Sequence, residues 1–188
     1  MSFKTRYGIN TDLMYDDIPG QLIGLRLFSS PGTVDFEWDE NGIIFEPNGS
    51  ISSQNDRILI NIQYPHQAKM NGKLYPHIHW EQVSSNDVIF TMQYRIQSNG
   101  VSKETTWTTM TASAVNDSIF TYTSGTLNQI TKFKNGSDYF IDMSGKSISS
   151  TLQFRLTRTD ATAGNVIGTF FDLHYEIDSY GSRLEYIK

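Results

Sequence analysis

The strongest constraint on the fold of this chain is the alternation of apolar and polar residues in four separate segments. Every second residue is apolar or aromatic in residues 58–64, 88–97, 152–157 and 171–178. A repeat of two residues places these side chains on one face of a β-strand, whereas an amphipathic helix requires a repeat near 3.6. Each segment is therefore predicted to be a strand with one face against a core.

Turn sequences separate these strands from weaker ones. Weaker alternation predicts further strands at residues 43–46, 75–83, 105–110, 118–123 and 138–142. The breaks contain residues that favour tight turns, namely Pro47-Asn48-Gly49, Asn71-Gly72, Asn99-Gly100, Asn135-Gly136 and Ser144-Gly145. About nine short strands without a long amphipathic helix indicate an all-β protein. We predict an antiparallel two-sheet sandwich, jelly-roll-like, over residues 43–188.

The first 42 residues differ from the rest of the chain. Within residues 1–40, seven acidic residues accompany three basic ones, and Pro19-Gly20 and Pro31-Gly32 interrupt the segment. Sustained alternation is missing here. We therefore predict an extended N-terminal arm over residues 1–42, with one helical turn around Asp12–Asp17, that docks to other proteins outside its own sandwich.

Composition narrows the classes of partner. The chain has 15 basic and 20 acidic residues, which gives a formal net charge of −5. Nucleic-acid binding and attachment to an anionic membrane both depend on clustered Lys and Arg, so we expect neither partner. The chain contains no cysteine, which excludes disulfides and thiolate metal ligands. Synthesis in a reducing cytoplasm, with stability from packing or from partner subunits, is the expectation.

Three of the four histidines are placed where a site can form. Alternation puts Tyr75, His77, His79 and Glu81 on one face of a strand, with Trp80 on the other. His174 shares the polar face of its own strand with Asp172 and Glu176. Two histidines at positions i and i+2 of a strand suit a metal that takes a third His or a carboxylate from a neighbouring strand.

This pattern resembles that of the cupins, which are jelly rolls with a His-x-His strand, a later Glu and a distant third His. The corresponding metal ligands here are His77, His79, Glu81 and His174. The spacing departs from the cupin pattern, because Glu81 follows His79 after one residue instead of three or four. We therefore expect no metal, no other cofactor and no catalytic residue, and we assign the cluster a structural or interface role. Its members are Tyr75, His77, His79, Trp80, Asp172, His174 and Glu176.

Two states are open for these imidazoles. A histidine paired with a carboxylate has a raised pKa and stabilises the fold at low pH, whereas a buried neutral histidine loses stability as the pH falls.

Two further segments carry a family resemblance. The first contains Tyr64-Pro65-His66 and then Tyr75-Pro76-His77-Ile78-His79-Trp80. The second contains Phe154–Asp160, then His174-Tyr175-Glu176-Ile177-Asp178, and near the end Gly181-Ser182-Arg183. In this order the motifs resemble a group of tailed-bacteriophage proteins that are described as virion structural proteins. The resemblance covers roughly residues 55–188 and includes no catalytic signature.

The resemblance implies a non-enzymatic structural component of a bacteriophage virion, made in the bacterial host cytoplasm. It also implies a symmetric assembly, of which a homotrimer is the expected form, and docking to other virion proteins of the capsid, the portal or collar, or the tail. Head fibre, decoration, collar and tail fibre components all fit. Two alternatives are a cupin-like metal-dependent enzyme and a carbohydrate- or receptor-binding module with a host-surface glycan as partner.

Overall fold

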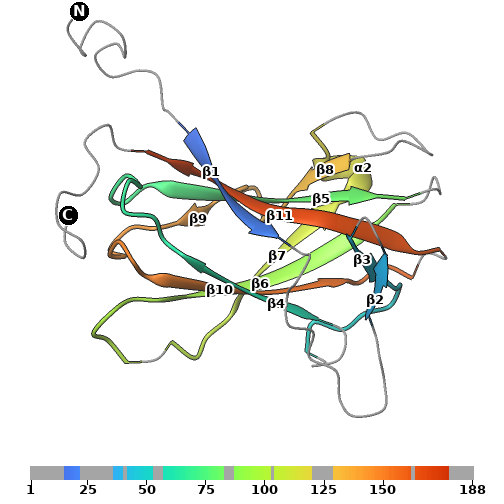
Figure 1. The fold of residues 1–188 in the computed structure, drawn as a ribbon, viewed down its shortest axis with the longest axis horizontal. Coiled ribbons are helices and arrows are strands. Elements are labelled where there is room, and N and C mark those ends of the chain that lie inside the picture. The colour runs from blue at the N-terminus through green and yellow to red at the C-terminus, as the bar shows by residue number, and fades with distance from the viewer. Residues whose placement is uncertain are drawn as a thin grey trace, which may run out of the picture.

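Two antiparallel sheets packed face to face form the protein in the computed structural model (Figure 1). The structure describes residues 15–21, 36–39, 42–52, 57–82, 87–102, 104–119, 129–161 and 164–177.

The seven-stranded sheet contains both strands that carry the histidine cluster. Its central path runs β2 (Phe36–Asp39), β3 (Gly42–Phe45), β11 (Val166–Glu176), β5 (Lys73–Glu81) and β8 (Gln129–Lys132). Two further strands lie beside this path, with β1 (Tyr15–Gln21) paired to β11 and β9 (Ile141–Asp142) paired to β5.

The four-stranded sheet has the order β4 (Ile58–Gln63), β10 (Thr151–Arg158), β6 (Ile89–Gln97) and β7 (Thr108–Ser113). A single helical turn, α2 (Ala114–Asp117), follows β7. The Ser113 side chain caps this turn by accepting a hydrogen bond from the backbone N–H of Asn116.

The order of the strands is that of a jelly roll. Strands β3 to β6 alternate between the two sheets, β6 and β7 are neighbours in one sheet, and β8, β10 and β11 alternate again. Each sheet therefore pairs strands that are distant in sequence, as in the two Greek keys of a jelly roll. The predicted fold class, an antiparallel two-sheet sandwich of jelly-roll type, is confirmed.

The core lies between the layers and is built from the alternating residues. Phe90 of the four-stranded sheet meets Phe45 and Trp80 of the opposite sheet edge to face, with ring centroids 5.7 Å apart in both pairs. Phe154 and Phe171 make a similar contact across the sheets at 5.1 Å. Such aromatic pairs add about 0.5–1.5 kcal/mol each to the stabilisation from burial.

The predicted turns coincide with unusual backbone angles. A positive φ occurs at Asn48, Asn71, Gly100, Gly136 and Gly145, one in each turn named from the sequence. Asparagine and glycine are the residues that adopt this left-handed region at least cost, so these five predictions are confirmed.

Some strand boundaries differ from the prediction. The strand expected at 105–110 is β7 at Thr108–Ser113, and the one expected at 138–142 is reduced to β9. Of the expected strand at 118–123, Ser118 forms an isolated bridge to Thr131, and residues 120–123 lie outside the described part of the chain. Strand β8 was not predicted, because its buried residues, Gln129 and Thr131, are polar and give no apolar alternation.

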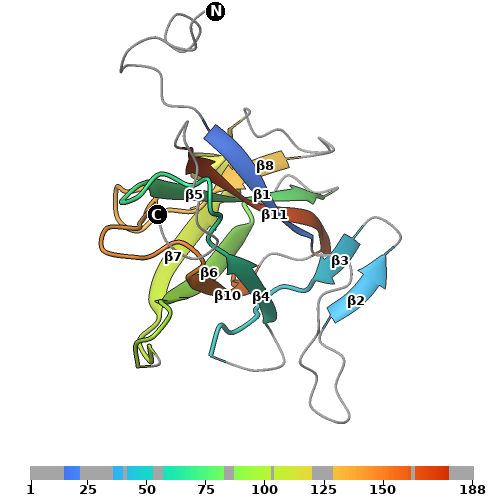
Figure 2. The same cartoon turned by 60° about the vertical axis from the view of Figure 1, so that its left-hand side comes forward.

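The prediction for residues 1–42 is wrong for two segments. Strand β1 pairs with β11 over seven residues, and β2 pairs with β3, so both belong to the sandwich (Figure 2). Around Asp12–Asp17 the chain is in a strand from Tyr15 onwards, where a helical turn was expected. Pro19 concealed this strand, since proline cannot donate a backbone hydrogen bond, but an edge strand such as β1 tolerates it. The other residues of the predicted arm, up to Asn41, lie outside the described residues.

Candidate functional site

The candidate site lies where β5 and β11 run side by side. In the antiparallel register, Tyr75 is opposite His174, His77 is opposite Asp172, and His79 is opposite Phe170. Residues directly opposite each other on neighbouring strands point to the same face of a sheet. The two strands therefore bring together Tyr75, His77 and His79 with Asp172 and His174, which the sequence placed on the polar faces of their strands, and Phe170 joins them from β11.

A β-bulge in β11 places Asp172 opposite His77. The register of β11 against β5 shifts between Gly168 and Phe170, so that Gly168 is opposite Trp80 and Phe170 is opposite the next residue, His79. Without the extra residue, the core residue Phe171 would have been placed opposite His77. The bulge therefore turns Asp172 towards the two histidines of β5.

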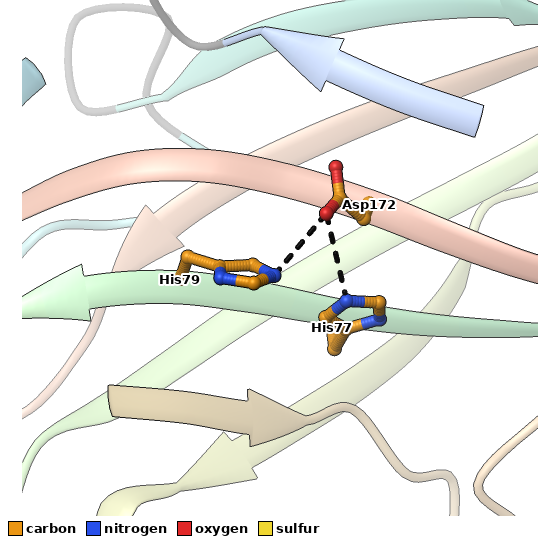
Figure 3. Close-up of side chains that lie close together, drawn as sticks. All are labelled: His77, His79 and Asp172. Carbon is orange, nitrogen blue, oxygen red and sulfur yellow. Dashed lines mark ion pairs between the residues drawn. The ribbon is translucent and has the colours of Figure 1, made fainter. Parts of the chain in front are cut away.

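Both imidazoles of β5 approach a single carboxylate oxygen (Figure 3). The distance to Asp172 Oδ2 is 3.1 Å from His79 Nε2 and 3.7 Å from His77 Nε2. The His77 side chain is buried, whereas that of His79 is 29% exposed and that of Asp172 is 16% exposed. The site is therefore an outer-face cluster whose innermost member is His77.

His174 and Tyr75 flank the cluster. The His174 ring lies edge to face with that of His77, with centroids 4.4 Å apart, and the His77 and His79 centroids are 5.1 Å apart. The backbone carbonyl of Tyr75 lies 3.4 Å from His77 Nδ1. The Tyr75 ring meets Phe140 with centroids 6.3 Å apart.

The remaining residues proposed from the sequence lie elsewhere. Trp80 is fully buried in the core, and its indole N–H donates to the Thr131 hydroxyl at 2.8 Å. Glu176 forms an ion pair with Lys69, with 3.1 Å between Nζ and Oε2. Glu81 is opposite Ile167 in the register. Trp80 thus supports the sandwich, and Glu176 ties β11 to the loop before β5.

Burial sets the protonation state of His77. Burial lowers its pKa to about 4, assisted by the neighbouring His174, against the raising effects of the Tyr75 carbonyl and the Asp172 carboxylate. An unfolded histidine has a pKa near 6.5, so folding favours the neutral imidazole. The contribution of His77 to stability is complete above about pH 6.5 and falls as the pH drops towards 4. For His77, the structure thus favours the second state, the buried neutral imidazole.

Three donor atoms of the cluster are spaced like metal ligands. One ligand atom each of His77, His79 and Asp172 lies within 4.8 Å of the other two. Among the described residues, His174 and Glu81 supply no ligand atom to such a group. The set expected for the cupin-like alternative is therefore not the set that the fold assembles. Asp172 takes the third position, which the sequence could have indicated only through the register of β11 against β5.

The outer face of the four-stranded sheet is polar and carries Trp107. The guanidinium groups of Arg155 and Arg95 lie over the indole ring, at 3.7 Å and 4.5 Å from its centroid. A hollow of about 460 Å³ on the same sheet is lined by Asn61, Ile62, Gln63, Asn99, Ser149 and Thr151. The described cation–π contacts of Trp107 are thus with the protein's own arginines.

The fold and the cluster together define an all-β jelly-roll protein with a His-His-Asp group on the outer face of its larger sheet. A scan of family models, a search of curated proteins and a search of solved structures each find no match to this chain. Within the described residues, no helix has the length and apolar character needed to cross a bilayer.

Proposed function

We propose that this protein is a non-enzymatic structural component of a bacteriophage virion that assembles as a symmetric oligomer, with a homotrimer as the expected form. The proposal rests first on the motif resemblance described from the sequence. The jelly roll agrees with it, because this fold recurs in viral capsid domains, although lectins and cupins share it.

The observation that carries the proposal is the structural role of the resembling motifs. Trp80 of the first motif segment and Arg158 and Tyr175 of the second are among the largest fully buried side chains of the described residues. Each fixes contacts of the sandwich, as in the hydrogen bond from Trp80 to Thr131. Motifs that build the fold are expected in a protein whose function is its shape and its surfaces.

Unpaired strand edges supply a reason for assembly. In the described pairings, β4 ends the four-stranded sheet and β2 ends the central path of the other sheet, whereas isolated bridges to Lys134 and Ser118 partly cover the outer edges of β7 and β8. An exposed strand edge is a template for association, and symmetric oligomers cover such edges. In this proposal the residues before β1 in the sequence provide docking contacts to the particle.

Two measurements test the proposal. Mass spectrometry of purified virions from a phage that encodes this chain is expected to detect it at a fixed copy number, with a non-structural phage protein as the negative control. Light scattering of the recombinant protein is expected to give three times the 21.4 kDa mass of one chain. Absence from the virions would overturn the virion assignment, and a stable monomer at micromolar concentration would overturn the trimer.

A further inference from the structure

We propose that His77, His79 and Asp172 bind one divalent first-row transition-metal ion, such as Zn²⁺, which joins β5 to β11 without taking part in catalysis. This site goes beyond the proposed function and does not depend on it. It also differs from the cupin-like set, because Asp172 replaces Glu81 and His174.

The spacing of the donor atoms agrees with tetrahedral coordination. Two donors at about 2.0–2.1 Å from a zinc ion are separated by about 3.3 Å when the coordination angle is tetrahedral. The distances from Asp172 Oδ2 to the two Nε2 atoms are 3.1 Å and 3.7 Å, which bracket this value. All three donors lie within 4.8 Å of one another, and His79 is exposed enough to adjust its ring.

Tyr75 favours the tautomer of His77 that can bind a metal through Nε2. Its carbonyl oxygen accepts a hydrogen bond from the His77 Nδ1–H at 3.4 Å, which leaves the lone pair of Nε2 directed to the cluster. Histidine ligands of metals commonly donate their second ring N–H to a backbone carbonyl in this way. In this form, His77 places a lone pair, and not a proton, towards the carboxylate of Asp172.

Two buried atoms of the site lack a hydrogen bond. His79 Nε2 is 3.1 Å from Asp172 Oδ2 but is not aligned to form a hydrogen bond with it, and Asp172 Oδ1 has no hydrogen-bond partner among the described residues. Buried polar atoms without partners destabilise the folded state. A cation between the imidazoles and Asp172 Oδ2 takes the lone pair of His79 Nε2 and balances the negative charge of Asp172.

Imidazole and carboxylate ligands select the class of ion. Two histidines and one carboxylate suit Zn²⁺, Fe²⁺ or Co²⁺ better than the hard ions Ca²⁺ and Mg²⁺, which prefer oxygen ligands only. Three protein ligands leave a further coordination position for water. The ligands come from two neighbouring strands, so the ion would stabilise the centre of the seven-stranded sheet.

Cobalt titration of the full-length protein tests the site. After treatment with a chelator and its removal, addition of Co²⁺ is expected to give visible absorption bands that saturate at one ion per chain and vanish when Zn²⁺ is added. Zn²⁺ at about 100 times its Kd is expected to raise Tm by about 5–10 °C. A parent protein with neither the cobalt bands nor the Tm shift would overturn the proposal.

Matched variants identify the ligands. Asp172→Asn and His79→Gln are expected to abolish the cobalt bands and the Tm shift while the metal-free proteins keep the circular dichroism of the parent. His66→Ala is the control, because His66 contacts Ser149 at 2.7 Å, away from the cluster, and it is expected to bind as the parent does. Glu81→Gln is also expected to retain binding. Undiminished binding in Asp172→Asn and His79→Gln, or loss in Glu81→Gln, would overturn the assignment of these ligands.

Discussion

Arg158 and Asp160 form a bidentate ion pair inside the sandwich. Arg158 Nε lies 2.9 Å from Asp160 Oδ2 and Nη2 lies 2.8 Å from Oδ1, with side chains 0% and 5% exposed. Arg158 also donates to the carbonyl of Phe45, and Asp160 accepts from the backbone N–H of Ile89. The pair thus holds the end of β10 against β3 and β6.

Replacing Asp160 should be costly. Asp160→Asn is expected to lower the free energy of unfolding by about 3–5 kcal/mol, because it leaves a buried guanidinium without a counter-charge. Urea denaturation of the parent and the variant measures this difference. Asp138→Asn is the comparison, since Asp138 is exposed at the surface, and it should cost less than about 1 kcal/mol. Equal effects of the two changes would contradict the role given to the buried pair.

The buried hydrogen bond between Trp80 and Thr131 should couple the two residues energetically. Thr131→Val leaves the indole N–H without its acceptor and is expected to cost about 1–3 kcal/mol. Trp80→Phe loses both the bond and packing volume, at a cost of about 2–4 kcal/mol. A double-mutant cycle measured by urea denaturation is expected to give a coupling of about 0.5–3 kcal/mol. Additive effects would show that the bond contributes nothing beyond packing.

Asp117 at the end of α2 should make the free energy of unfolding depend on pH. Burial raises its pKa, but hydrogen bonds from Lys134, the Ser113 N–H and Tyr139 outweigh burial, and the net pKa lies below 3.8. A depressed carboxyl pKa stabilises the fold above the unfolded value and loses this contribution as the pH falls through the folded value. Asp117→Asn is therefore expected to cost about 1–3 kcal/mol at pH 7, with a smaller difference from the parent below about pH 4.

Urea denaturation at pH 7, 5 and 3 measures the effect of Asp117. Asp138→Asn serves as the control, because Asp138 is exposed at the surface, and it should shift stability little at any of these pH values. A cost for Asp117→Asn that stays the same from pH 7 to pH 3 would disprove the assignment of the acid dependence to this carboxylate.

The sequence predicted those parts of the fold in which local pattern and tertiary packing agree. Strands β4, β6 and β10 each have one face in the core, so their alternation is complete and their positions were predicted within one residue. The alternation of β11 is interrupted by its bulge, and the prediction from residue 171 missed residues 166–170. Strand β1 lies at an edge and contains proline, and its pairing with β11 depends on a partner far along the chain. Local pattern carries no information on such a partner.

The candidate site, like the fold, could be predicted from the sequence only in part. Alternation placed His77 and His79 on one face of β5, and His174 with Asp172 on one face of β11. The choice of Asp172 as the residue opposite His77 depends on the neighbour relation of the two strands and on the bulge after Gly168. Neither follows from spacing in one sequence, because a shift by a single residue would reverse the face that β11 presents to β5.

Truncation of the N-terminus should separate docking from folding. Deletion of residues 1–14 removes only chain before β1 and is expected to leave the free energy of unfolding unchanged while abolishing attachment to the particle. Deletion of residues 1–21 also removes β1, which pairs with β11 from Phe170 to Glu176. That edge of β11 then becomes unpaired, so we expect lower stability and a tendency to aggregate. Urea denaturation and hydrogen exchange of the β11 peptide measure both effects. Identical stability and exchange in the two truncated proteins would show that β1 contributes nothing to the sandwich.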